Sequence, residues 1–346
     1  MSDPCFVAVG ASGQIARTLD NGDTWEEVGP GTDPVAGLPD GYTPEFVSVD
    51  TDGAGVWLAC GEYTGIWRST DNAATWAPVA GTYTDSNLTS PRWQWLCYCG
   101  ANTWLANPRS LTEIYRSTDN GATWGAIAHG VDIGGSPRYL YQIVADTESG
   151  IVWSTTGFSN DYGARSTDRG ATWSAVTQDP DNFTQQYSLS FVNGSFVGAN
   201  VSHVYLSSTA AEGSWTSVIW SDPSELGGGI VGRIVFDGTV YWCAHIAGKG
   251  ILRSATLNSA VWEYLDPDGT DRNPDFVATD GAGVTIFVGE YNAFTPEVYS
   301  GLYRANSDLT TDTLTPPVGD TDHWHSIAYG GSAAPAATPR SWLTWW

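Results

Sequence analysis

Ser117-Thr-Asp119-Asn-Gly121-Ala-Thr123-Trp124 is the stretch that decides the fold, because the chain repeats it. The same Ser/Thr-x-Asp-x-Gly/Ala-x-Thr-Trp pattern, here called the box, occurs at residues 18–25, 69–76 and 166–173. Degenerate copies end at Trp215 and Trp262, so the box tryptophans recur about every 47 residues. A fixed period of this length is typical of repeat folds, in which each repeat is one supersecondary unit.

Short apolar runs flank each box, and Gly, Asp and Asn turns bound them, as expected for β-strands. The unit around the second box shows four runs, at residues 46–50, 56–60, 66–69 and 76–79. Seven units of about 47 residues nearly fill the chain of 346 residues. The sequence therefore predicts an all-β, seven-bladed propeller of four-stranded antiparallel blades over residues 1–332.

The first blade lacks one strand in this interpretation. The first apolar run, Phe6–Val9, matches the second strand of the other units, so an innermost strand is missing. Trp324–Tyr329 near the C-terminus can supply it. We predict that this C-terminal strand pairs into blade one and closes the ring, which also removes exposed sheet edges.

The box has the composition of a tight turn. An Asp carboxylate can accept hydrogen bonds from backbone N–H groups of its own turn, and Gly permits a positive φ. The pattern also resembles the Asp-box (BNR) repeat of sialidase-like and photosystem assembly-factor-like propellers. We therefore interpret Asp20, Asp71, Asp119 and Asp168 as structural parts of turns rather than as catalysts or ligands.

The charge balance restricts the partners. Asp and Glu number 38 against 14 Lys and Arg, for a net charge of −24. Such a field repels phosphate backbones and anionic lipids, so we expect neither nucleic-acid binding nor membrane insertion.

The sequence also bears on localisation and cofactors. No signal peptide is recognised, which predicts synthesis in the cytoplasm. We expect no cofactor and no metal: Asp266–Asp271 lacks the Glu of a calcium loop, and Asp320–His325 reads as a turn that enters a strand.

The arginines fall into two groups. Six occupy one place in the repeat, beside the box, and we interpret them as scaffold residues that pair with box or neighbouring-blade carboxylates: Arg17, Arg68, Arg116, Arg165, Arg253 and Arg304. Among the others, Arg92 and Arg138 follow Ser-Pro just before the innermost strands of blades three and four. Arg272 lies near the same position in blade seven.

These unrepeated arginines predict a ligand-binding face. Because strands alternate in direction, the connections between blades share one face with the turns between second and third strands. The loops of that face are the longest and most irregular, and variable loops on a rigid scaffold often bind ligands. Our candidates are Arg92, Trp93, Arg138, Tyr139, Arg272, Glu62, Tyr63, Glu290 and Tyr291.

The resemblance raises the question of glycosidase activity. Sialidases hold a carboxylate sugar with three arginines and use a Tyr activated by Glu, together with an Asp acid. The family's Arg-Ile-Pro motif is absent, and most of its catalytic set has no counterpart here. We therefore assign no catalytic residue and favour a non-catalytic interaction module. A glycoside hydrolase, sialidase-like or glucanase-like, on the same face is the alternative.

The C-terminal segment suggests a docking role. After a linker rich in Pro and Ala, the chain ends in Trp342-Leu343-Thr344-Trp345-Trp346. Indoles are unfavourable in water, so we predict that residues 333–346 form a tail that docks on a protein partner; packing on its own ring is the alternative. The leading hypothesis is a component of a larger assembly, such as a bacteriophage tail, fibre or capsid accessory, which binds protein or surface glycan.

Overall fold

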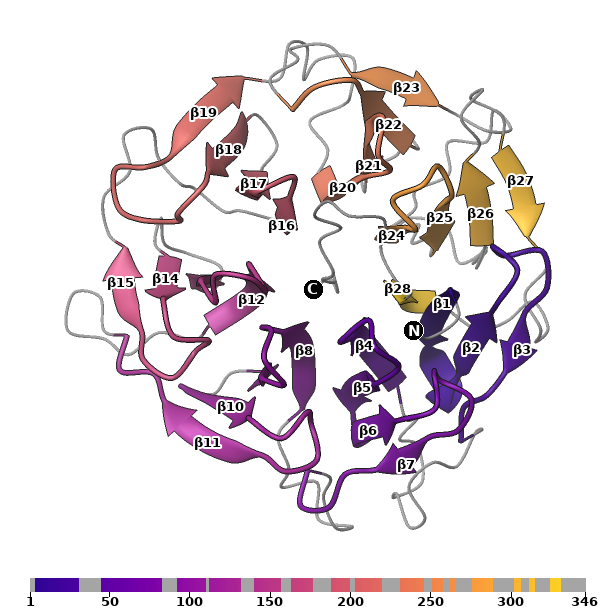
Figure 1. The fold of residues 1–346 in the computed structure, drawn as a ribbon, viewed down its shortest axis with the longest axis horizontal. Helices are drawn as coiled ribbons and strands as arrows, with labels where there is room; N and C mark the ends of the chain where they lie inside the picture. Colours follow the sequence, from indigo (N-terminus) through magenta and orange to yellow (C-terminus); the bar gives the residue numbers. More distant parts are fainter. Residues whose placement is uncertain are drawn as a thin grey trace, which may run out of the picture.

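Seven antiparallel sheets of four strands each stand around a central axis (Figure 1). The computed structural model describes residues 4–30, 45–82, 92–109, 112–131, 140–156, 163–176, 188–199, 203–219, 231–245, 251–257, 262–265, 276–288, 302–305, 311–314 and 324–330. The predicted all-β, seven-bladed propeller is confirmed. Within the described residues, no helix has the length and apolar character needed to cross a membrane.

Blade two shows the repeating unit, with strands β4 (Glu45–Thr51), β5 (Trp57–Glu62), β6 (Gly65–Ser69) and β7 (Ala77–Pro78) from the axis outward. Pro78 lies in the outermost strand, where a missing backbone N–H removes no ladder bond.

The other six blades repeat this arrangement. They contain β1 (Cys5–Gly10), β2 (Ile15–Thr18), β3 (Glu26–Glu27) and β28 (Trp324–Gly330); β8 (Trp93–Tyr98), β9 (Trp104–Pro108), β10 (Glu113–Ser117) and β11 (Gly125–Ala128); β12 (Leu140–Ala145), β13 (Val152–Thr156), β14 (Gly163–Ser166) and β15 (Ser174–Val176); β16 (Ser188–Val192), β17 (Ser195–Ala199), β18 (His203–Ser207) and β19 (Thr216–Ile219); β20 (Val231–Phe236), β21 (Tyr241–His245), β22 (Ile251–Ser254) and β23 (Glu263–Leu265); β24 (Phe276–Thr279), β25 (Thr285–Val288), β26 (Leu302–Ala305) and β27 (Thr311–Leu314).

The ring closes as the sequence predicts. The C-terminal strand β28 pairs antiparallel with β1 and forms the innermost strand of blade one. Phe6 lies opposite Tyr329 in this register, with their ring centres 4.8 Å apart. The predicted boundary between residues 332 and 333 and the tail lie outside the described residues.

Adjacent blades pack face to face. One buried cluster joins Leu58 and Ile66 of blade two to Leu96 and Trp104 of blade three. Large indoles dominate these interfaces, and Trp57, Trp95 and Trp153 among others are fully buried. Burial of such rings is the main favourable term in holding one blade against the next.

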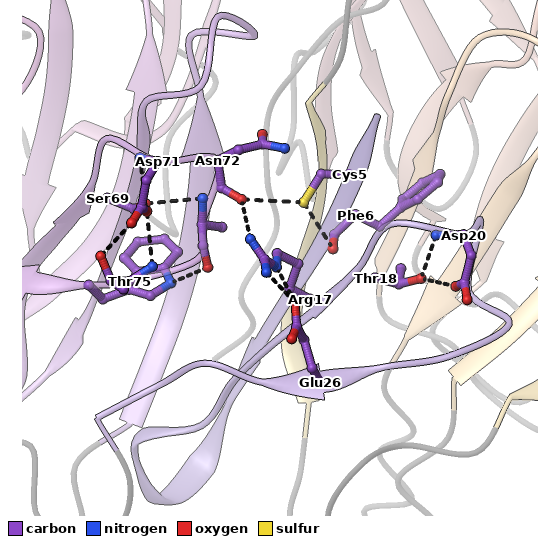
Figure 2. A network of polar contacts seen from close by, with 12 residues as sticks. Cys5, Phe6, Arg17, Thr18, Asp20, Glu26, Ser69, Asp71, Asn72 and Thr75 are labelled. Carbon is purple, nitrogen blue, oxygen red and sulfur yellow. Dashed lines mark hydrogen bonds and ion pairs between the residues drawn. The ribbon is translucent and has the colours of Figure 1, made fainter. Parts of the chain in front are cut away.

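A repeated polar contact also links the blades. Arg17 of blade one donates from Nη1 to the backbone carbonyl of Asn72 in the box of blade two, at 3.0 Å, and also pairs with Glu26 of its own blade (Figure 2). The equivalent arginines reach the same carbonyl position of the next box: Arg68 to Asn120 at 2.9 Å, Arg116 to Arg169 at 2.9 Å, Arg165 to Thr209 at 2.7 Å and Arg304 to Asn21 at 3.2 Å. We call these five contacts the inter-blade latches.

The latches refine the interpretation of the repeated arginines. Their shared partner is a backbone carbonyl rather than the expected carboxylate. A carboxylate of the neighbouring box takes part at Arg304, which also pairs with Asp23 at 2.5 Å. Arg253 differs, because it pairs with Glu263 of its own blade at 2.5 Å and lies over the Trp242 ring.

Arg116→Met should therefore lower the free energy of unfolding more than Arg253→Met. The first change removes a charged donor and leaves a carbonyl unsatisfied, at a cost of about 2 kcal/mol. The second removes a pair with an exposed carboxylate and should cost less than about 1 kcal/mol. Urea denaturation of both variants measures the difference, and equal losses would contradict a special role for the latch.

Candidate functional site

Four charged side chains meet at one end of blades two and three. Glu45 begins β4 and Glu62 ends β5, while Arg92 directly precedes β8 and Arg109 directly follows β9. Innermost strands begin at this end, which also carries the turns between second and third strands. We call it the entry face; the boxes, between third and fourth strands, lie on the opposite face.

The two arginines share one carboxylate. Arg109 Nη1 lies 3.0 Å from Glu62 Oε1, and Arg92 Nη1 lies 3.6 Å from Oε2 of the same group. The Arg109 backbone N–H donates to the Arg92 carbonyl at 2.7 Å, which ties the two segments together. The Arg92 guanidinium lies 5.2 Å from the centre of the Tyr63 ring, within cation–π range. We call Glu62, Tyr63, Arg92 and Arg109 the arginine cluster.

The cluster is open to solvent on its positive side. The side chains of Arg92 and Arg109 are 49% and 41% exposed, whereas that of Glu62 is 24% exposed. Both guanidinium-bearing side chains are therefore more exposed than the carboxylate that they share, and both are accessible to an anionic group from solvent.

Glu45 places a second carboxyl group beside Glu62. The two residues lie directly opposite each other in the β4–β5 ladder. Burial, and secondarily the negative charge of Glu62, raises the pKa of the Glu45 carboxyl above its usual value. At the neighbouring Gly61, an added Cβ would lie 1.7 Å from the Glu45 carbonyl oxygen, so the two strands approach too closely there for a side chain.

The structure brings together some of the predicted site residues. Arg92, Glu62 and Tyr63 are in contact as described above. Trp93 is buried, and its Nε1 donates to the Thr82 carbonyl at 2.7 Å, so its indole belongs to the core rather than to the exposed face. The remaining candidates lie outside the described residues: Arg138, Tyr139, Arg272, Glu290, Tyr291, Trp342, Leu343, Trp345 and Trp346.

Sequence reasoning missed Arg109 and Glu45 as members of this site. Arg109 had a signal, since it is an unrepeated arginine in an irregular loop of the predicted face. Glu45 had none, because its significance depends on the strand register that places it opposite Glu62.

Arg233, another unrepeated arginine, lies elsewhere. It is the third residue of the innermost strand β20 and is 3% exposed. Burial lowers its pKa to about 9, against the opposing influence of Asp50 and Cys97. Arg233 is therefore an interior residue and does not contribute to the exposed arginine cluster.

The box aspartates use both carboxylate oxygens inside their own turns. Asp119 Oδ1 accepts from the Thr123 backbone N–H at 2.9 Å and the Ser117 hydroxyl at 2.7 Å, and Oδ2 accepts from the Thr123 hydroxyl at 2.6 Å. The Ser117 oxygen in turn accepts from the Gly121 N–H at 2.9 Å. The same bonds recur at Asp20, Asp71 and Asp168, and Figure 2 shows the turn of Asp71.

No protein-family model matches the sequence, and no curated protein matches it. Solved structures are similar in fold. YCF48 bound to a D1 peptide is 18% identical with a TM-score of 0.58, over 82% of this chain and 86% of that one. YCF48 from Cyanidioschyzon merolae is 16% identical (TM-score 0.57, 82% and 88%), and virginiamycin B lyase from Staphylococcus aureus is 13% identical (0.51, 88% and 99%). At these identities the likeness shows the propeller fold alone.

Asp119→Ala tests the role of a box carboxylate. Burial raises the pKa of Asp119, but the hydrogen bonds from Thr123 and Ser117 outweigh it and hold the pKa at about 2. A depressed carboxyl pKa stabilises the fold above the unfolded-state pKa, and this contribution is lost as the pH falls towards 2. The variant should therefore lose about 1 kcal/mol at pH 7 and less at pH 3.

Urea denaturation at the two pH values measures both losses. Ligand binding at the entry face should remain unchanged in this variant. Lost binding with unchanged unfolding would instead make the box a ligand site.

Proposed function

We propose that this chain is a non-catalytic interaction propeller that binds an acidic protein segment through its entry face. The observation that carries the proposal is the arginine cluster, in which two half-exposed guanidinium groups share one carboxylate. The chain as a whole has a net charge of −24. Two accessible guanidinium groups on so acidic a molecule form a local site for a negatively charged partner.

The geometry suits a peptide carboxylate. An arginine has five N–H donors in a rigid fork, and the described contacts with Glu62 occupy a small part of them at Arg92 and Arg109. Guanidinium groups bind carboxylates in pairs of parallel hydrogen bonds, which adds geometric specificity. The Tyr63 ring beneath Arg92 fixes that guanidinium, so less side-chain freedom is lost when a ligand binds.

The similar structures provide a precedent for this use of the fold. YCF48 has been solved with a D1 peptide bound, so a propeller of this shape can hold a peptide. Function depends on the residues of a site rather than on the fold that carries it. The precedent therefore supports a peptide ligand, and the arginine cluster supplies the chemistry.

We also propose that this interaction takes place within a larger assembly, with a bacteriophage virion as the leading hypothesis and surface glycan as a second class of ligand. The acidic composition and the tryptophan-rich segment 342–346 support the assembly role. We assign the box to the Asp-box type on its hydrogen bonds, which join the Asp to the Ser and Thr of the same turn.

One observation favours a glycoside hydrolase as the second candidate. Glu45 and Glu62 lie opposite each other, and the raised pKa of Glu45 is a property of a general acid. However, Glu62 is engaged in ion pairs with two arginines, so its carboxylate oxygens already have partners. The binding function therefore explains the arrangement of Glu62 and the two arginines better than the hydrolase does.

Removal of both guanidinium groups tests the binding function. Arg92→Ala combined with Arg109→Ala should weaken binding of a fluorescein-labelled, glutamate-rich decapeptide at least about tenfold, since two charged contacts are lost. Fluorescence anisotropy at pH 6 and constant salt measures the affinity. Arg253→Met, which removes a charge outside the cluster, is the matched control and should bind as the unaltered protein does.

Equal binding by the double variant and the control would contradict the proposed site. Aryl glycosides, including a sialoside, test the second candidate in parallel. Turnover that disappears in Glu62→Gln would replace the binding function with a hydrolase.

A further inference from the structure

We propose that Glu45 is a pH sensor for the arginine cluster, which holds an acidic ligand when the Glu45 carboxyl is neutral and releases it when that carboxyl is ionised. This inference rests on the proposed function, because it concerns the regulation of the same site. It identifies a residue that makes no contact with the ligand in the proposal and acts through charge alone.

Strand pairing holds the backbones of the two glutamates together. Glu45 and Glu62 are direct partners in the antiparallel ladder of β4 and β5. Side chains of directly opposed residues lie on the same side of a sheet, with Cβ atoms about 5 Å apart. The close approach of the strands at Gly61 fixes this register, because no side chain fits against the Glu45 carbonyl there. The backbones of the two residues therefore cannot separate without disrupting the ladder, which keeps each carboxyl group within the electrostatic influence of the other.

The protonation state of Glu45 sets the charge that a ligand meets. With Glu45 neutral, the two guanidinium groups exceed the single Glu62 carboxylate by one positive charge. With Glu45 ionised, a second negative charge lies beside Glu62, and the charges of the four residues balance. An acidic ligand then competes with an internal carboxylate for them, so its affinity falls.

The direction of the change with pH follows from the environment of Glu45. Burial, the larger cause, and the charge of Glu62 both raise its pKa above the value of about 4.3 for an ordinary glutamate. Exposed carboxylates of a peptide ligand titrate near that ordinary value. A pH range therefore exists in which the ligand is still ionised while Glu45 is neutral, and binding is strongest there.

The test must distinguish Glu45 from the other titratable and charged residues near it. Strand β4 packs against β5, β28, β1, β8 and the 3-10 turn η1 (Ala11–Gly13). At the Glu45 end, β5 contributes Glu62, β8 is preceded by Arg92, and β28 carries His325 as its second residue. The residues of η1 and the adjoining Gly10 carry no charge. Protonation of His325 would also strengthen anion binding at low pH, so a variant must distinguish the two residues.

The affinity of the labelled glutamate-rich decapeptide between pH 5 and pH 8 tests the sensor. At constant ionic strength, the affinity of the unaltered protein should fall as the pH rises through the range, by up to about tenfold for one unit of charge near the ligand. Glu45→Gln should show no such fall. His325→Gln and Glu113→Gln, which removes an exposed carboxylate of the same face, should keep the pH dependence.

The outcomes separate the sensor from the binding function. Binding with an unchanged pH profile in Glu45→Gln, or a flat profile in His325→Gln, would overturn the sensor and leave the binding function in place. Absence of binding by the unaltered protein at every pH would overturn both. A raised pKa means that ionisation opposes folding, so Glu45→Gln should melt no lower than the unaltered protein at pH 8. Glu45→Ala provides a second neutral variant if it does.

Discussion

The guanidinium-to-carbonyl latch is the repeated polar contact that aligns adjacent blades, beside the indole burial that holds them together. In four of the five latches the acceptor is a box residue with positive φ: Asn21 (60°), Asn72 and Asn120 (both 58°) and Arg169 (55°). A positive φ is uncommon outside glycine, although Asn adopts it more readily than most residues, and here the Asp and Ser side chains of the box hold the turn on both sides. The hydrogen bonds of the box therefore orient the acceptor carbonyl. The latch to that carbonyl then positions the preceding blade. Asp119 thus connects one turn to the geometry of its neighbour without touching that neighbour itself.

Side-chain packing between adjacent blades is also adjusted at the box. The box glycine of one blade lies on a strand of the blade before it: a Cβ at Gly121 would lie 2.7 Å from Leu58 Cδ1, and Gly121 also has a φ of 82°. Blade two has Ala73 in this position, and blade one places the smaller Val7 where blade two has Leu58, opposite the latch arginine. Both belong to one buried cluster. The volume lost on one side of the junction matches the volume gained on the other, which close packing requires.

The sequence was sufficient for the architecture because the architecture is periodic. The box tryptophans gave the number of blades, and the unmatched run Trp324–Tyr329 identified the closing strand. Side-chain partners were less accessible. Trp93 was expected to contact ligand, but it is the first residue of β8 and its indole is buried in the core. Glu45 gained its significance only from its register with Glu62. Contacts that depend on strand register cannot be inferred from the period of the sequence repeat.

Departures from the repeat locate the candidate site. The position taken by Glu45 and Glu62 in blade two is occupied in blade three by Arg92 and Arg109, one step outward from the pair Trp93 and Pro108. Two opposed carboxyl groups in one blade thus lie beside two opposed guanidinium groups in the next. Five of the six repeated arginines form latches beside the boxes, and Arg253 pairs with Glu263 of its own blade, so these guanidinium groups already have partners. Because the repeated residues maintain the ring, a residue pair outside the repeat can change without loss of the fold. The entry end of blades two and three is therefore a place where selection for binding can act.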